Sequence, residues 1–358
     1  MKKIGVLGAG LVGLAVFLGL QDQAQFFQAY LVAFLFWMAI PLGALALRLI
    51  NYLTGGEWGK ALNPFIEAGI RTIPVIILLF IPIIFGMKSL YPWTHQTHEM
   101  AHVLTGFKGA YLTSHGFLLR AAICLGLWLV ISLVLSKVGK GNEKWQEAPT
   151  SVQGFSGVAL FLYVLTMTVA ITDWVMSLKP EWYSTIYGVM FMIGQGLSAL
   201  SFGLITVVYF YSAEQKSKLK VEVYHDLGKL LLAFVMLWAY MNLSQFLIIW
   251  SGNLGEEAVW YLDRFKNGWQ YAGFGMLILQ FFLPFTILLS RNFKRNPESL
   301  GKIAVLIFFA RLADLFWTVK PSFCTNVCFN LLDLILWAGI GGIWIAFFFA
   351  QKEALSKK

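Results

Sequence analysis

Long runs of uncharged, apolar residues are the feature that most limits what this chain of 358 residues can fold into. Ten such runs occur, each long enough to cross a hydrocarbon core of about 30 Å as a helix. Only 13% of the residues are charged, whereas a soluble domain has about 25%. The sequence therefore predicts an all-α integral membrane protein with about ten transmembrane helices. The predicted spans are 4–20, 26–50, 72–90, 115–136, 155–178, 185–212, 228–251, 269–290, 301–319 and 328–350.

A repeated signature closes two of these spans. The segment from Asp173 to Pro180, DWVMSLKP, recurs from Asp314 to Pro321 as DLFWTVKP. Proline ends each helix because it lacks an N–H donor and restricts the residue before it. The repeat predicts two parallel four-helix bundles with one flanking helix on each side. The predicted divisions are 1–25, 26–180, 181–325 and 326–358.

Two further segments predict how the helices pack. The segment FWMAIPLGALAL, 36–47, resembles FMIGQGLSALSF, 191–202, and both are rich in small residues that let helices approach closely in lipid. The loop 54–72 is amphipathic, and we expect it to lie along the membrane surface.

Lysine and arginine predict the orientation. When the chain starts on the inner side, nineteen of its 27 lysines and arginines fall in inner segments. Such a bias places both termini in the cytoplasm and both signatures at the outer face. It also accounts for the net charge of +9 without nucleic-acid binding. The start, Met-Lys-Lys and an apolar run, also fits a signal peptide; no small-residue cleavage site stands out before Gln21, so we expect a retained helix.

Charged groups in or near membrane spans are costly, and each is a functional hypothesis. Asp173 and Asp314 are the first candidates for proton transfer, followed by Asp333 near the start of the last span. The alternative is a set of helix-end ion pairs, with Arg311 one turn from Asp314 and a lysine near each signature aspartate. Three cations are predicted to be snorkelling anchors at helix ends: Arg48, Arg120 and Lys229.

The span 228–251 is polar along its length. Asn242 and Gln245 are three residues apart and share a helix face. With Gln195 of the preceding span they are candidates for holding ordered water across the bundle, as a proton path requires. Hydrogen bonding that only joins the helices explains the three side chains equally well.

The cysteines and histidines suggest no redox centre. The three cysteines form neither a disulfide framework nor a paired CxxC site. Cys324 and Cys328 could face each other one turn apart on the outer side; a disulfide or ligand role is the less favoured alternative, and we expect both to stay reduced. No CxxCH is present and no histidine lies within a span, so we expect no haem, no metal and no quinol oxidation in this chain. The loop 91–114 holds His95, His98 and His102, whose spacing permits zinc or copper, but a docking loop is the preferred interpretation.

Several long motifs resemble one family. They are LTGGEWG at 53–59, FSG at 155–157, DWVMSLKPEWYSTIYG at 173–188, DLGKLLLAFVMLWAYMNLSQFLIIWSGN at 226–253 and GGIW at 341–344. They are similar to the ActF type of polysulfide-reductase-like (NrfD-type) membrane subunit of bacterial alternative complex III. The resemblance covers nearly the whole chain and implies ten helices with two four-helix bundles. This chain departs from the family at Lys179, where an acidic residue usually follows MSL, so a carboxylate role there does not transfer.

The resemblance implies a subunit of a quinol:cytochrome c or terminal-oxidase oxidoreductase in the bacterial inner membrane. Haem c and iron–sulfur clusters are then expected in a multi-haem cytochrome c and an iron–sulfur protein, and the quinol in the paralogous membrane subunit. Lipids and a terminal oxidase are further expected partners. The chain itself is predicted to be structural, to lack a redox cofactor and to translocate protons. Two alternatives remain: a stand-alone proton- or ion-coupled transporter, and a purely structural scaffold.

Overall fold

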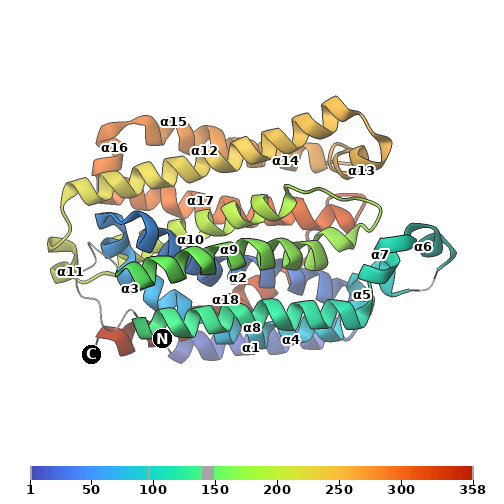
Figure 1. Ribbon diagram of the computed structural model, residues 1–358, viewed down its shortest axis with the longest axis horizontal. Coiled ribbons are helices and arrows are strands. Elements are labelled where there is room, and N and C mark those ends of the chain that lie inside the picture. The colour runs from blue at the N-terminus through green and yellow to red at the C-terminus, as the bar shows by residue number, and fades with distance from the viewer. Residues whose placement is uncertain (1, 96, 139–148, 357–358) are drawn as a thin grey trace.

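The computed structural model describes residues 2–95, 97–138 and 149–356, which form helices and loops without any strand (Figure 1). The all-α fold class is therefore confirmed. The longer helices are α1 (Lys2–Gly19), α2 (Gln23–Thr54), α3 (Glu57–Ile70), α4 (Ile73–Phe85), α8 (Ser114–Val138), α9 (Thr150–Trp174), α10 (Tyr187–Phe210), α12 (Val221–Gly252), α13 (Gly255–Arg264), α14 (Trp269–Leu277), α15 (Leu283–Leu289), α17 (Pro297–Val319) and α18 (Leu331–Ser356). The shorter ones are α5 (Met87–Leu90), α6 (His98–Val103), α7 (Gly106–Tyr111), α11 (Ala213–Ser217), α16 (Arg291–Arg295), the 3-10 turns η1 (Pro92–Thr94), η2 (Met176–Leu178) and η4 (Lys320–Ser322), and the π-helical turn η3 (Ile278–Phe282).

Within the described residues, eight helical segments are long and apolar enough to cross a membrane, or nine if the bent pair α3 and α4 is one span. The prediction was about ten, and the difference lies in two helices. The predicted span 72–90 is divided, because α4 ends at Phe85 and is bent by 44° against α3. Helix α17 is long enough, but every stretch of spanning length within it includes three charged residues, Lys302, Arg311 and Asp314. It is therefore not among the helices apolar enough to cross a membrane.

The two ends of the bundle differ in what they contain (Figure 1). At one end α1 begins and α18 ends, beside α11 and α16, and we name it the termini end. At the opposite end lie α6, α7 and α13, together with the ends of α9 and α17 that bear the signatures. We name it the signature end. Which end faces the cytoplasm stays a prediction, and four of the nineteen cations behind it, Lys140, Lys144, Lys357 and Lys358, lie outside the described residues.

Helices α2 and α10 form the centre of the bundle. All of the apolar core of α2 is buried, as expected of a helix that is apolar on every face. A side chain on Gly43 would overlap the backbone carbonyl of Gln195 and the methyl group of Ala199. The two resembling segments 36–47 and 191–202 are thus the pair that packs most closely at the centre, as their small residues predict.

The other helices are arranged around this central pair. Helices α4 and α9 pack on α2, and α8 packs on both of them. Helices α12 and α17 pack on α10, and the segment α14–η3–α15 lies against α12 and α17. Helix α18 packs on α2 and α1, where Gly8 meets Gly339 and Gly342. These contacts place one group of helices around α2 and another around α10. The boundaries 1–25, 26–180, 181–325 and 326–358 stay predictions.

The prediction for the loop 54–72 is wrong in one respect. Its helix, α3, does not lie on a surface but packs against α2, α10 and α18, with nine of its fourteen residues buried. Its apolar side chains, among them Leu62 and Phe65, face the interior. Glu67 is buried with them because it pairs with the buried Arg48 of α2. Pairing the two charges lets both enter the apolar interior.

We predict that Gly43→Val destabilises the protein, because the added isopropyl group has no room between α2 and α10, where even its Cβ would overlap Gln195. Overpacking of this kind costs about 1–3 kcal/mol, and thermal unfolding in detergent measures it. The matched control is Gly126→Val in α8, where an added side chain meets nothing within 4 Å. Equal losses in both variants would contradict a close α2–α10 contact.

Candidate functional site

Asp173 is fully buried near the signature end of α9 and is held by an arginine of the neighbouring helix. Arg120 of α8 donates from Nε to Oδ2 at 2.7 Å and from a terminal nitrogen to Oδ1 at 3.0 Å. The same arginine donates to the Tyr111 carbonyl at 3.0 Å and lies 3.7 Å above the Tyr111 ring. This two-point contact is the strong form of an arginine–carboxylate pair, and it connects Asp173 to the loop beyond the bundle.

Asp314 occupies the matching position near the end of α17, but its arginine comes from its own helix. Arg311, one turn earlier, donates to Asp314 Oδ2, and the Trp238 indole of α12 donates to the same oxygen at 3.1 Å. The guanidinium lies against α10, where a side chain on Gly194 would overlap it, and its Nε reaches Ser198 Oγ at 3.4 Å. The helix-end ion pair anticipated from the sequence is therefore present.

The lysines of the two signatures do not contact their own aspartates. Lys179 pairs with Asp263 of α13, and Lys320 pairs with Asp333 at the start of α18 at 2.5 Å. Asp263 lies outside the spans. Burial alone would raise the pKa of its carboxyl, but hydrogen bonds from Lys179 and Lys266 outweigh burial and lower that pKa. Each signature thus has a buried aspartate paired with an arginine near the end of its helix, and a lysine just beyond that is paired with another aspartate.

The three amide side chains predicted to hold water together contact different neighbours. Gln195 accepts a hydrogen bond from Tyr163 of α9 at 2.5 Å. Asn242 donates to the Trp238 carbonyl of its own helix at 2.8 Å, and Gln245 accepts from Ser184 at 2.7 Å. Among the described contacts no hydrogen bond joins any two of the three. Asn242 is the one that lies beside an ion pair, that of Arg311 and Asp314.

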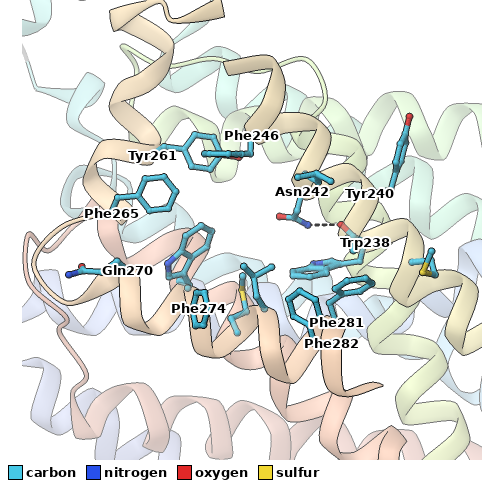
Figure 2. A pocket seen from close by; sticks show the side chains of 17 residues that line it. Trp238, Tyr240, Asn242, Phe246, Tyr261, Phe265, Gln270, Phe274, Phe281 and Phe282 are labelled. Carbon is cyan, nitrogen blue, oxygen red and sulfur yellow. Dashed lines mark hydrogen bonds between the residues drawn. The ribbon is translucent and has the colours of Figure 1, made fainter. Parts of the chain in front are cut away.

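A cavity of about 750 Å³ lies between α12, α13, α14, η3 and α17 (Figure 2). Aromatic rings form most of its wall, among them Phe246, Tyr261 and Phe281, and the exposed side chains of Leu243 and Phe274 place its opening on the outside of the bundle. Its size and apolar walls are typical of a site for a small molecule.

A second, much smaller cavity lies behind the first. It has a volume of about 20 Å³, enough for about one water molecule. Trp238 and Asn242 line both cavities, and Arg311 and Asp314 line the smaller one. The wall of the large cavity is therefore also the wall of a water-sized space beside a buried ion pair.

The predictions for three cations have different outcomes. Arg48 and Arg120 are not snorkelling anchors: Arg48 is fully buried against Glu67 and Asn63, and Arg120 holds Asp173. Lys229 is exposed and pairs with Asp226, as an anchor at a helix end would. The Arg120 pairing had a signal in the sequence, because consecutive antiparallel helices place the start of α8 beside the end of α9.

The prediction that Cys324 and Cys328 stay reduced is wrong, since they form a disulfide in the loop between η4 and α18. The two cysteines are four residues apart in the sequence, and their Cα atoms lie 6.2 Å apart. The third cysteine, Cys124, is buried and free. In the parts of the chain that the structure describes, no group of three or more histidine, cysteine, aspartate or glutamate side chains converges to hold a metal ion.

Comparison of the sequence with models of known protein families and with characterised proteins gives no match.

We predict that Arg311→Met destabilises the protein by about 3–5 kcal/mol, because it leaves the Asp314 carboxylate buried without its cation. The double variant with Asp314→Asn should recover most of the loss, since no uncompensated charge remains. The free energy of unfolding in detergent measures both effects. Lys229→Met, which breaks an exposed pair, is the control and should cost about 0–1 kcal/mol. An Arg311→Met protein as stable as the control would show that the pair holds nothing together.

Proposed function

We propose that this chain is a membrane subunit of a multi-subunit quinol oxidoreductase of the alternative complex III type, with a structural and a proton-translocating role. The observation that supports the proton role is the Arg311–Asp314 pair beside a water-sized cavity. A carboxylate next to a water molecule within the membrane is the basic unit of a proton relay. Trp238 and Asn242 border the same space and fix its shape.

The first bundle supplies a second candidate relay group. Asp173 and Arg120 lie close to the signature end, and one fifth of the Arg120 side chain is exposed. Through Tyr111 the pair touches the segment that covers that end. In this proposal Asp314 handles protons within the second bundle, and Asp173 exchanges them with the surface. Asp333, held by Lys320, is the candidate next to Asp314 along the chain.

The disulfide supports the orientation that the cation count predicts. Disulfides persist in oxidising compartments such as the bacterial periplasm. The Cys324–Cys328 disulfide lies between η4 and α18, at the signature end. We propose accordingly that the signature end faces the periplasm and that both termini face the cytoplasm of a bacterium.

The partners follow from the resemblance and are part of the proposal. A multi-haem cytochrome c and an iron–sulfur protein would carry the electrons, and a paralogous membrane subunit would bind the quinol. The segment of α6 and α7 projects from the signature end (Figure 1). Phe107 on it is 81% exposed. The segment is therefore the proposed contact with a periplasmic partner.

We predict that Asp314→Asn lowers the number of protons released per quinol oxidised, because the amide cannot exchange a proton. The complex isolated through this chain and reconstituted in liposomes provides the measurement, with a pH dye inside. Because asparagine leaves the buried Arg311 without its counter-ion, subunit content is measured first, and proton yield is compared per assembled complex, whose quinol oxidation rate should stay near that of the wild type. The matched control is Asp226→Asn, which changes an exposed aspartate near the start of α12, far from Asp314 along the chain. An assembled Asp314→Asn complex with an unchanged proton yield would leave the scaffold function in its place.

The large cavity favours a second candidate function. Transporters of several folds bind their substrate within the membrane, next to charged or broken helices. The wall of the cavity in Figure 2 includes residues of the π-helical turn η3. It shares Trp238 and Asn242 with the small cavity that Arg311 and Asp314 line. An experiment distinguishes this function from the first. A transporter would move protons or ions across the membrane of liposomes as the purified chain alone, without a redox partner.

A further inference from the structure

Lys294 at the termini end is an ion without a matching counter-ion. It is only 7% exposed, and its aliphatic stem packs on Gly228 of α12. In the part of the chain that the structure describes, no carboxylate forms an ion pair with Lys294 or with its neighbours Arg291 and Arg295. The Arg295 Nε is also buried, without a hydrogen-bond partner. The side chain of Lys294 is thus largely buried, and an anion that approaches its ammonium would be favoured there.

These cations form one patch with the start of α12. We name as the termini-end patch the five residues Arg291, Lys294, Arg295, His225 and Lys229. The four lysines and arginines all lie within electrostatic range of His225. Helix α16, which supplies three of them, packs directly on α12. The patch therefore concentrates positive charge at one place on the rim of the bundle.

The acidic residues nearby do not neutralise the patch. Asp226 neutralises only Lys229 of the patch, at 3.1 Å. Glu298 and Glu214 are paired with lysines outside it, Lys302 at 3.0 Å and Lys218 at 2.8 Å. Glu222, in the first turn of α12, is exposed. The patch keeps a net positive charge after these pairs are counted.

An apolar cavity of about 690 Å³ adjoins the patch. Val208, Leu219 and Val221 contribute to its walls, and the partly buried Lys216 lies on its rim. Tyr224, which lines the cavity, is four residues from Gly228, which supports Lys294, so both lie on one face of α12. The cavity and the buried cation are thus about one helical turn apart, at the level where α12 enters the membrane.

We propose that this place binds an anionic phospholipid, with its phosphate on the termini-end patch and an acyl chain in the adjoining cavity. The positive charge of the patch favours an anionic head group. The apolar walls of the cavity favour an acyl chain, which a free anion does not have. Basic pockets between helices at a membrane surface bind such head groups. The ligand would also supply the counter-ion that Lys294 and Arg295 lack.

The test uses the full-length chain in mixed micelles of detergent with equal amounts of phosphatidylglycerol and phosphatidylcholine that bear the same acyl chains. After washing, mass spectrometry counts the lipid molecules of each kind that stay bound. We expect a preference for phosphatidylglycerol of about five-fold or more, the effect of one cation near an anionic head group. Equal retention of the two lipids by the wild-type chain would overturn the proposal, whatever the variants do.

The variant is Lys294→Met with Arg295→Gln, because methionine keeps an apolar stem on Gly228 while both charges are removed. It should lose the preference, whereas the control Lys60→Met, which removes one paired and exposed charge at the same end, should keep it. Circular dichroism and gel filtration check that each variant is folded, and Lys294→Met alone replaces the double variant if that one is not. Inorganic phosphate added to the wild type should displace no lipid; if it does, the site binds a free anion and the assignment to a phospholipid is wrong.

Discussion

A carboxylate in the interior of a membrane protein needs a cation beside it, and the arrangement of this bundle depends on meeting that need twice. Asp173 and Asp314 are both buried near the same end, and each has an arginine within hydrogen-bond distance. Neither charge would be stable there alone. The helices that carry the arginines, α8 and α17, are therefore held in register with the parts of the bundle around them.

The two halves of the repeat meet this need in different ways. In the first, Arg120 comes from the preceding helix, so that the pair joins α8 to α9. In the second, Arg311 comes from the same helix, and the joining role passes to Trp238 of α12 and to the close contact of Arg311 with Gly194 of α10. This difference leaves a water-sized space beside Asp314. In the function proposed above, Asp314 is therefore the first candidate for proton exchange.

The sequence predicts most of the fold because a lipid environment leaves few options. Apolar runs of spanning length must be helices, and Pro180 and Pro321 mark where two of them end. The features of the fold that the sequence does not predict depend on contacts between residues far apart in the chain. The burial of Glu67 in α3 rests on its meeting Arg48, nineteen residues earlier in the chain, and the hydrophobic pattern alone cannot show it. The division of 72–90 at Gly86 is a similar case.

The candidate site was only partly predictable for the same reason. Asp173, Asp314 and Arg311 stand out as charges in apolar runs, and their burial follows from that pattern. The cation that pairs with Asp173 and the cavity beside Asp314 both depend on how the antiparallel helices align. The Cys324–Cys328 disulfide depends on the path of its loop. Gln195 and Asn242 show the limit most clearly, since Gln195 accepts its hydrogen bond from Tyr163 of α9 and Asn242 donates to a carbonyl of its own helix.

The central claim is that this chain belongs to a respiratory complex, and one measurement tests it most directly. The chain is isolated by an affinity tag from native membranes in a mild detergent, and the eluate is examined by its optical spectrum and a haem stain. A multi-haem c-type cytochrome and an iron–sulfur protein should elute with it in fixed proportion. A colourless chain that elutes alone would contradict the claim and leave transport as the function to test.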